Sequence, residues 1–555
     1  MNWLRSPFVT SLGIATVILT TFLQRFTGPL EHGLLYHWPS SSAIIIVPLL
    51  LIICGTWFLL SAFIFLIKRH HKLERFAWAV LGVIVFREAL EAVYWFAGMR
   101  STGYPRPVPH SLNVLFVFLT VTVLFFSTVT PLSRSAQWRQ MRAALITMLG
   151  FIAFSGAFTI LQLVIILIGS RHLNDPSRII PPQHTIATAA PKSRVLWIIL
   201  DELSYRQLYE HRYPGLELPE FDRLASTSTV FTNVKPAGLF TQAVIPALIM
   251  GIPDENIGGL NHDIHVPYSG YPLSIRNGIT HRWQRFDPQD TVFHDALADG
   301  YHTAVVGFYN PYCRILPGVL DRCYWNGAVG FVDDIPAADS ISQNLKLFLK
   351  VMLAPRLKLL HVMAELSGDD DSRQVHQQVY LDTAREADSI LDDRSITFAM
   401  LHLPIPHPYG IYDRIQHKLS TSTTSYIDNL ALTDLFLTHL REKLQANGTW
   451  DKTTLVIMGD HSWRVTYPPG RGFGWSSVPN WTKEETIASD GKKFDPRPGY
   501  LVKLAGDSTP ASIATPFDAA RTRTLLDHLL DGSITTTPQL VAWASNSSDD
   551  HVPSH

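Results

Sequence analysis

Long apolar stretches dominate the first 170 residues of the chain. Polar or basic residues separate five of them, which are Phe8–Leu23, Ala43–Ile67, Phe76–Gly98, Leu112–Thr130 and Ala143–Gly169. A helix needs about 20 apolar residues to cross the hydrocarbon core of a bilayer, so the last four are long enough and the first is marginal. The pattern predicts a five-helix transmembrane domain over residues 1–170.

The first stretch has a second interpretation, a cleaved signal peptide. Its end, Phe22-Leu23-Gln24-Arg25, lacks the small residues of a cleavage site, which favours a membrane helix. Basic residues in the short loops then indicate the orientation. With the N-terminus inside, the inner segments carry eight Lys and Arg and the outer loops three, so residues from 171 onward are predicted to lie outside.

Charged residues interrupt the third apolar stretch at Arg87, Glu88 and Glu91. Charges are costly in lipid and are expected to face the interior of the helix bundle. Arg87 and Glu91 stand four residues apart and can pair on one helix face. Two roles stay open here, an internal ion pair that holds the bundle and a contact with lipid head groups.

A different pattern begins after residue 170. Residues 171–191 are polar and hold four prolines, which indicates a linker. Short apolar runs then alternate with helical stretches, which predicts an α/β domain over residues 192–534, with a largely parallel sheet flanked by helices. The predicted strands are Val195–Leu200, Thr303–Phe308, Thr397–Leu403, Thr454–Met458 and Tyr500–Leu504, and the predicted helices are Thr291–Gly300, Ile341–Leu366, Tyr426–Ala446 and Phe517–Leu530. A flexible tail is expected over residues 535–555.

Composition separates the same two parts. The chain is 46% hydrophobic and 17% charged, below the roughly 25% charged residues that are usual in soluble domains. Residues 1–170 hold 12 Lys and Arg against 4 Asp and Glu, which leaves 34 against 43 for the other 385 residues. An acidic second part argues against a nucleic-acid partner.

Three cysteines are present. Cys54 lies in the second apolar stretch, and Cys313 and Cys323 lie close together in the outer part. In an oxidising compartment such a close pair is typical of a disulfide. A zinc site would need further Cys or His at ligand spacing, and the sequence around this pair has none.

Polar residues of a consistent kind follow three predicted strands. They are Asp201 and Glu202 after the first, His402 and His407 at and after the third, and Asp460 and His461 after the fourth. Ligands of parallel α/β sheets bind beyond the carboxyl ends of the strands, and carboxylates with imidazoles suit Zn²⁺ or Mn²⁺. Taken singly, each is as well explained as a helix cap or a surface histidine, and their combination favours the metal site.

Thr241 is the candidate nucleophile. Gly238 permits a tight turn before it, and an apolar helix is predicted to start at Thr241. Backbone N–H groups and the helix dipole favour anions at such a position. The alternative is that Thr241 only caps the helix.

The order of these motifs resembles the alkaline-phosphatase/sulfatase superfamily. It looks closest to the membrane-bound branch that contains phosphoethanolamine transferases and lipoteichoic acid synthases, in which five membrane helices precede an extracytoplasmic catalytic domain. The match is good over residues 195–251 and 397–464, and residues 495–503 are similar to the strand that follows the metal motif.

The resemblance implies specific roles. Asp201, Thr241, Asp460 and His461 match the metal ligands, and Thr241 also matches the nucleophile. His407 matches a histidine that contacts the transferred group, while Glu202 would replace or supplement Asp201. The further candidates for binding the substrate oxygens are His402, Arg464 and Lys503, since Arg suits phosphate geometry.

The sequence departs from two branches of the superfamily. Sulfatases need a Cys or Ser in a Cys/Ser-x-Pro-x-Arg motif for oxidation to formylglycine, and Thr241 has no Pro two residues later. Phosphoethanolamine transferases usually carry another histidine soon after the Asp-His pair and several disulfides. Here the next histidine after His461 is His528, and only one close cysteine pair exists.

Together these features predict a multi-pass inner-membrane enzyme with an extracytoplasmic catalytic domain. It would use Zn²⁺ or Mn²⁺, with Ca²⁺ as a further candidate, and move a phosphoethanolamine- or phosphoglycerol-like group through Thr241. The partners would be a membrane lipid donor and an envelope lipid or glycan acceptor. The alternatives are a sulfatase-like hydrolase of sulfated or phosphorylated glycans and an inactive membrane scaffold.

Overall fold

Two compact units make up the chain. The computed structural model describes residues 3–27, 43–102, 136–169, 182, 193–252, 264–265, 274–276, 283–310, 312–326, 340–358, 370–422, 424–466, 474–477 and 481–546. Unit 1 comprises residues 1–35, 40–174 and 338–356, and unit 2 comprises the remainder. Each unit is described by itself.

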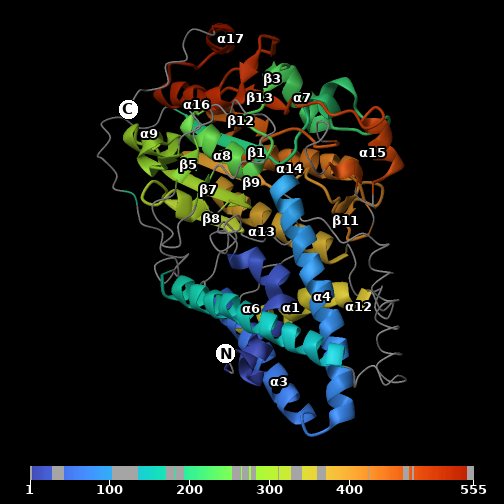
Figure 1. Cartoon of the computed structure of the whole chain (residues 1–555). Coiled ribbons are helices and arrows are strands. Elements are labelled where there is room, and N and C mark those ends of the chain that lie inside the picture. The colour runs from blue at the N-terminus through green and yellow to red at the C-terminus, as the bar shows by residue number, and fades with distance from the viewer. Residues whose placement is uncertain are drawn as a thin grey trace. The chain divides into compact units, whose positions relative to one another are not determined.

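Unit 1 consists of long helices (Figure 1). Their bounds are α1 Pro7–Thr27, α3 Ala43–Ile67, α4 His71–Thr102, α6 Ala136–Gly169 and α12 Ile341–Lys358, and a short 3-10 helix spans Trp3–Arg5. α1 contacts α3, α4 and α6. Buried side chains that include Ile14, Trp78 and Leu149 form the cluster between these helices.

Two helical segments in the described part of the chain are long and apolar enough to cross a membrane. They are Ala43–Ile67 and Arg142–Ile168, and α1 adds the shorter apolar stretch Pro7–Leu23. The predicted third stretch forms a helix within α4, but it holds three charged residues and is not one of these two segments. The predicted fourth stretch, Leu112–Thr130, lies outside the described residues.

The charges in α4 pair with one another. Arg87 forms an ion pair with Glu91 at 2.8 Å, as their spacing predicts, and another with Glu88 at 2.6 Å. Glu88 is buried. Arg87 therefore offsets one of the two carboxylate charges within the same helix, which reduces their desolvation penalty.

α12 groups with unit 1 rather than with the α/β unit in which the sequence pattern placed it. Asn344 donates a hydrogen bond to the carbonyl of Ile44 at 3.2 Å. The rings of Phe348 and Phe22 meet edge to face, 5.8 Å apart. These long-range contacts leave no local signal in the sequence, and the predicted boundary at residue 192 misses them.

Unit 2 is an α/β domain around an eight-stranded sheet (Figure 1). The order is β14-β2-β13-β12-β1-β9-β7-β8. Five pairings are parallel, and β13 is antiparallel to both of its neighbours, so the sheet is mixed. The strands of this sheet are β1 Arg194–Leu200, β2 Thr229–Phe231, β7 Thr303–Phe308, β8 Arg322–Asn326, β9 Phe398–Leu403, β12 Thr453–Gly459, β13 Tyr500–Lys503 and β14 Ala511–Ile513.

Smaller elements complete unit 2. The minor sheets contain β3 Val234–Lys235, β4 Ile264–His265, β5 Ser274–Arg276, β6 Trp283–Arg285, β10 Tyr412–Asp413, β11 Lys418–Leu419 and β15 Phe517–Asp518. The α-helices are α7 Pro219–Thr227, α8 Thr241–Met250, α9 Val292–Ala298, α10 Tyr312–Ile315, α13 Asp370–Asp392, α14 Tyr426–Ala446, α15 Lys483–Ala488, α16 Thr522–Asp531 and α17 Thr537–Ser545. α13 packs on β7, β8 and β9 and contacts α14.

All five predicted strands are present, because strands buried on both faces read as continuous apolar runs. The predictions near the C-terminus are less accurate. Phe517 starts the short strand β15, and the helix α16 begins only at Thr522. The flexible tail predicted from residue 535 is wrong for residues 537–545, which form α17, since Leu540 and Trp543 are buried there.

Candidate metal centre and active site

Two carboxylates follow the C-terminal ends of neighbouring strands in the sheet. Leu200 at the end of β1 pairs in parallel register with Gly459 at the end of β12, so Asp201 and Asp460 follow on neighbouring strands. A Cβ on Gly459 would lie 2.6 Å from the carbonyl oxygen of Leu203, so only glycine permits this close approach. Strand register therefore sets the distance between the two carboxylates.

Asp201, Asp460 and His461 form a buried cluster with metal-ligand chemistry. One ligand atom from each lies within 4.8 Å of the others. Nε2 of His461 is 3.2 Å from Oδ2 of Asp460 and 3.9 Å from Oδ1 of Asp201. Within the described part of the chain, Asp201 Oδ1 and His461 Nε2 have no hydrogen-bond partner. Buried polar atoms are rarely left in that state, and a shared cation would satisfy both.

The tautomer of His461 suits a ligand. Its Nδ1 lies 3.2 Å from the carbonyl of Ser462, which can only accept, so Nδ1 carries the proton and Nε2 presents a lone pair. Burial and the nearby Arg464 lower the pKa of His461 to about 3. The imidazole is therefore neutral at pH 7, as metal binding requires.

The charges of the cluster also favour a bound cation. Burial, followed by the neighbouring charges of Asp460 and Glu202, raises the pKa of Asp201 well above its usual range. Three carboxylates are buried together, and the ion pair of Glu202 with Arg464 at 2.6 Å offsets one charge. A divalent cation balances the remaining two, so the residues fit the metal that the sequence predicts.

Thr241 belongs to the cluster and does not cap its helix. It is the first residue of α8, and the capping position is Phe240, which makes no side-chain cap. The hydroxyl of Thr241 instead donates a hydrogen bond to Oδ2 of Asp460 at 2.8 Å. Of the two roles open from the sequence, the geometry supports the site hydroxyl.

Glu202 does not lie in the ligand group. Its Oε1 accepts hydrogen bonds from Arg464 Nε at 2.6 Å and Trp475 Nε1 at 2.9 Å, and its Oε2 accepts the Arg464 N–H at 3.3 Å. Because donors occupy both oxygens, Glu202 anchors Arg464 rather than supplementing Asp201. Its backbone is left-handed, with φ of 63°, and its N–H donates to Asp460 Oδ1 at 3.1 Å.

His402 lies in β9 with a hydroxyl partner. Its Nδ1 is 2.6 Å from the hydroxyl of Tyr312, and its buried Nε2 has no partner in the described residues. Burial lowers the pKa of His402 to about 4, so the ring is neutral. A Cβ on Gly307 would lie 2.4 Å from the Tyr312 ring, so glycine makes room for this tyrosine.

The disulfide lies next to Tyr312. Cys313 in α10 bonds to Cys323 in β8, with a Cα–Cα distance of 5.7 Å. The predicted pair is therefore joined in the structure. It fixes the short helix that carries Tyr312 to the edge strand β8.

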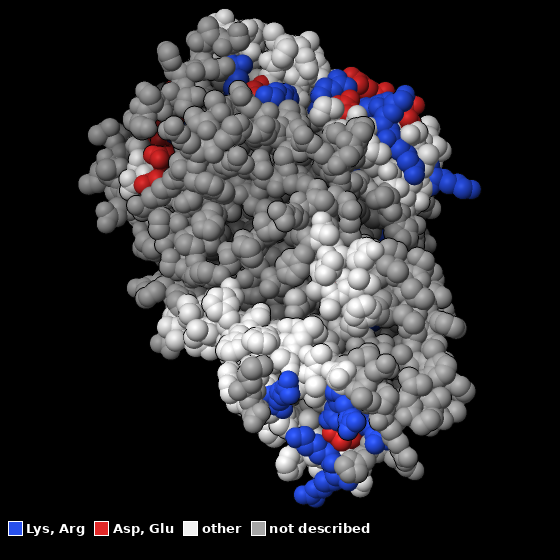
Figure 2. Space-filling view, in the orientation of Figure 1, with Lys and Arg blue, Asp and Glu red and all other residues white. Residues whose placement is uncertain are grey.

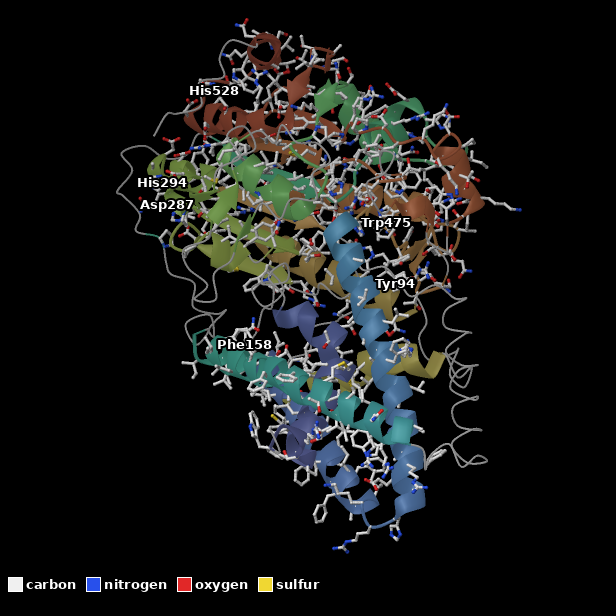
Figure 3. The ribbon with its side chains drawn as sticks, viewed as in Figure 1. Tyr94, Phe158, Asp287, His294, Trp475 and His528 are labelled. Atoms are coloured by element: carbon white, nitrogen blue, oxygen red, sulfur yellow. A yellow bond between two sulfur atoms is a disulfide. The ribbon has the colours of Figure 1, made fainter. Side chains whose placement is uncertain are left out.

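His407 lies in the loop after β9. Its Nε2 is 4.0 Å from Oε1 of Glu202, and its ring meets that of Trp475 edge to face at 5.1 Å (Trp475 is labelled in Figure 3). Asn429 of α14 holds the loop by donating to the carbonyls of His407 and Tyr409, at 2.8 and 3.1 Å. Burial lowers the pKa of His407 well below its usual range.

Lys503 is not part of this site, contrary to the prediction. It pairs with Leu455 near the start of β12, and its Nζ donates to the carbonyls of Trp450, Thr453 and Leu504. Because β13 runs antiparallel to β12, the C-terminal end of β13 lies beside the N-terminal end of β12, away from Asp460. His528 is also elsewhere, on α16, where its Nδ1 meets Ser533 at 2.8 Å (Figure 3).

The sequence motifs missed several residues near the site. Asn310 donates to the carbonyl of Thr241 at 3.2 Å, and His376 lies edge to face with His407, their ring centres 6.0 Å apart. Arg373 precedes His376 by one helical turn and is also buried. The asparagine follows strand β7, a position that could have signalled it, whereas the two α13 residues carry no motif.

This arrangement defines a class of protein. A mixed α/β sheet with a buried Asp-Asp-His cluster at one edge, and a hydroxyl at a helix start beside it, is the architecture expected of the alkaline-phosphatase/sulfatase superfamily. The chain belongs to the sulfatase family, whose sequence model matches residues 193–517. It is a sulfatase-like enzyme of phosphoric or sulfuric esters.

Several solved structures are similar to part of the chain. The lipoteichoic acid synthase LtaP from Listeria monocytogenes is 13% identical over 65% of this chain and 77% of its own, with a TM-score of 0.36. The phosphonate monoester hydrolase of Agrobacterium radiobacter is 15% identical over 64% and 78%, with a TM-score of 0.36. The PsFucS1 sulfatase from Pseudoalteromonas sp. is 15% identical over 61% and 68%, with a TM-score of 0.39. No curated protein matches the chain.

Proposed function

We propose that the protein is a membrane-anchored, metal-dependent enzyme that transfers a phosphoryl-linked head group through Thr241. The observation that carries the proposal is the hydrogen bond from the Thr241 hydroxyl to Asp460, inside the Asp201–Asp460–His461 cluster. A hydroxyl that donates to a carboxylate of the candidate metal cluster supports a role for Thr241 in attack on an ester. A side chain that only caps the helix would bond to the backbone of the first turn and not to Asp460.

Asp201, Asp460 and His461 would hold the divalent cation, Zn²⁺ or Mn²⁺, with Ca²⁺ as a further candidate. When bound, the metal would supply Lewis-acid polarisation of the phosphoryl oxygens and favour the ionised hydroxyl. Asp460 Oδ2 already accepts the hydrogen bond of Thr241, so it is the atom placed to receive the proton.

The reaction has two displacements. The Thr241 oxygen bonds to phosphorus while the bond to the donor's ester oxygen breaks, and the donor alcohol leaves with a proton. An acceptor hydroxyl, or water, then bonds to phosphorus and releases Thr241. A lipid or glycan acceptor makes the enzyme a transferase, and water makes it a hydrolase.

His402 and His407 would bind the non-bridging oxygens. Both are neutral at pH 7, because burial lowers their pKa values. With the Tyr312 hydroxyl donating to Nδ1 of His402, the imidazole proton is on the buried Nε2, which then has a donor to offer. Neutral donors stabilise developing oxyanion charge without adding charge to the site.

The membrane part of the proposal rests on unit 1. The helical segments Ala43–Ile67 and Arg142–Ile168 support anchoring, and we extend them to five crossings with residues from 171 onward outside. Exposed basic residues that include Lys68 and Arg69 gather where α3 meets α4 (Figure 2). This position is on the inner side in the proposed topology, in agreement with the preference of basic loops for that side.

The test compares cells that express the native chain with cells that express Thr241→Ala. Mass spectrometry of envelope lipids and glycans should show an acceptor that carries a phospho-head group only with the native chain, with the lipid alcohol of the donor as by-product. Identical profiles in both strains would contradict transfer. Loss of sulfate from a glycan would instead identify a sulfatase-like hydrolase.

A further inference from the structure

Arg373 is a buried arginine that has no anionic partner among the described residues. It lies near the start of α13 and is 2% exposed. Its Nε has no hydrogen-bond partner, and it forms no ion pair with any described residue. A guanidinium stays charged at all physiological pH values, and an unpaired buried charge carries a large desolvation penalty. The position is therefore expected to receive an anion.

A comparison within the chain shows what is missing at Arg373. Its guanidinium carbon lies 5.3 Å from the ring centre of Tyr409. Arg414 lies similarly over Tyr213, at 5.5 Å, but it also pairs with Asp428 at 2.6 Å. The aromatic contact is common to both arginines, and the carboxylate is present only for Arg414.

Arg373 lies beside the candidate active site. The Tyr409 ring under it is 5.6 Å from the ring of Trp475, whose indole donates to a carboxylate of the site. One turn along α13, His376 packs edge to face on His407. Arg373 and His376 of α13 therefore both contact the loop after β9, through Tyr409 and His407.

We infer that Arg373 binds a monoanionic tetrahedral ester of the substrate, a phosphodiester or a sulfate ester. The inference rests on the proposed function and specifies its substrate class. The charges of Asp201, Glu202, Asp460 and Arg464 with a divalent cation add up to zero. Arg373 then leaves one positive charge, which matches one negative charge on the substrate. A phosphomonoester, with up to two negative charges at pH 7, matches less well.

The forked N–H groups of Arg373 suit this ligand. A guanidinium donates two parallel hydrogen bonds to the oxygens of phosphate or sulfate. A phosphodiester is also the chemistry that a head-group donor lipid provides. Arg373 therefore acts as a binding residue for the ester, separate from the groups that hold the metal.

The experiment measures binding of bis(4-nitrophenyl) phosphate, a monoanionic diester, to the metal-loaded full chain in detergent. Calorimetry is done in the Thr241→Ala background, and 4-nitrophenyl phosphate is the dianionic comparison. Arg373→Met should raise the Kd for the diester about 10- to 100-fold, as expected for losing charge-assisted hydrogen bonds, while metal content stays unchanged. Arg373→Lys should recover part of the affinity. Arg414→Met, the matched control, should leave the Kd within about twofold.

An unchanged Kd in folded Arg373→Met would overturn the inference. Arg373→Gln removes the same charge and serves if the methionine protein does not fold. Tighter binding of the monoester than of the diester by the Arg373 protein would also contradict it. Failure of the proposed function looks different, because nitrophenolate release by the Thr241→Ala protein would exclude the nucleophile without changing the role of Arg373 in binding.

Discussion

Asp460 is hydrogen-bonded to Glu202, Thr241 and His461, so its replacement by asparagine is the most informative change. The side chain is fully buried. Its Oδ1 accepts the N–H groups of Glu202 at 3.1 Å and His461 at 2.8 Å, and its Oδ2 accepts the Thr241 hydroxyl at 2.8 Å. Asparagine has the same shape, and its carbonyl oxygen can keep both N–H bonds.

The magnitude follows from what Asp460→Asn removes. One negative charge and one ligand oxygen are lost, so the cluster no longer balances a divalent cation. Loss of an outer-shell partner alone weakens metal affinity about 10- to 100-fold, so loss of a ligand should exceed about 100-fold. Folding should change by only about 1–2 kcal/mol, since the hydrogen bonds weaken but largely persist.

The assay is metal content by plasma mass spectrometry, with thermal unfolding measured in parallel. Native protein should purify with about one Zn²⁺ or Mn²⁺ per chain, as the single cluster of three ligands among the described residues implies, and Asp460→Asn should be nearly metal-free. Asp434→Asn is the matched control. Asp434 is also buried, and it accepts the N–H groups of Glu220 and Phe221, so its loss should lower stability and leave metal content unchanged. Full metal occupancy in Asp460→Asn would refute the ligand assignment.

Three further predictions test the surroundings of the site. Gly307→Ala should destabilise the protein by about 1–3 kcal/mol and lower turnover, because the new Cβ meets the buried Tyr312 ring at 2.4 Å; an unchanged melting temperature would contradict this. Lys503→Met should leave kcat/KM within about twofold, since the lysine lies at the other edge of the sheet. Burial lowers the pKa of Lys503 to about 8 from 10.5. Between about pH 8 and 10.5 the unfolded chain therefore holds a proton that the folded chain has released, so the free energy of unfolding rises with pH. A series of denaturant titrations should show a smaller rise in Lys503→Met. Reducing the Cys313–Cys323 bond, which closes a separation of 10 residues, should lower stability by about 3 kcal/mol in the chain-entropy model, and no change in the denaturation midpoint would count against a structural role.

Much of the α/β unit was predictable because parallel strands buried on both faces leave apolar runs in the sequence. The rule that ligands bind at the carboxyl ends of such strands led to Asp201, Asp460 and His461. Lys503, a further candidate for the substrate oxygens, lies away from the site because β13 is antiparallel to β12, and strand direction leaves no mark in an apolar run.

The residues that α13 brings near the site were not predictable. α13 carries Arg373 and His376, but its position depends on packing against β7, β8 and β9. The roles of Glu202 and Arg464 could not be predicted from the sequence either, since the two residues that form this ion pair are 262 positions apart in the chain. A motif gives residue types in order, and only the tertiary fold decides which of two neighbouring carboxylates joins the candidate metal cluster.

The central claim is that Thr241 is the nucleophile, and trapping its covalent intermediate tests that claim most directly. Metal-loaded full-length protein is mixed with bis(4-nitrophenyl) phosphate, quenched in acid within the first turnovers and digested for mass spectrometry. We predict one 4-nitrophenyl phosphoryl group on the peptide that contains Thr241, with release of one equivalent of nitrophenolate, and neither in Thr241→Ala. Turnover at the native rate by Thr241→Ala, or an adduct on another residue, would contradict the account.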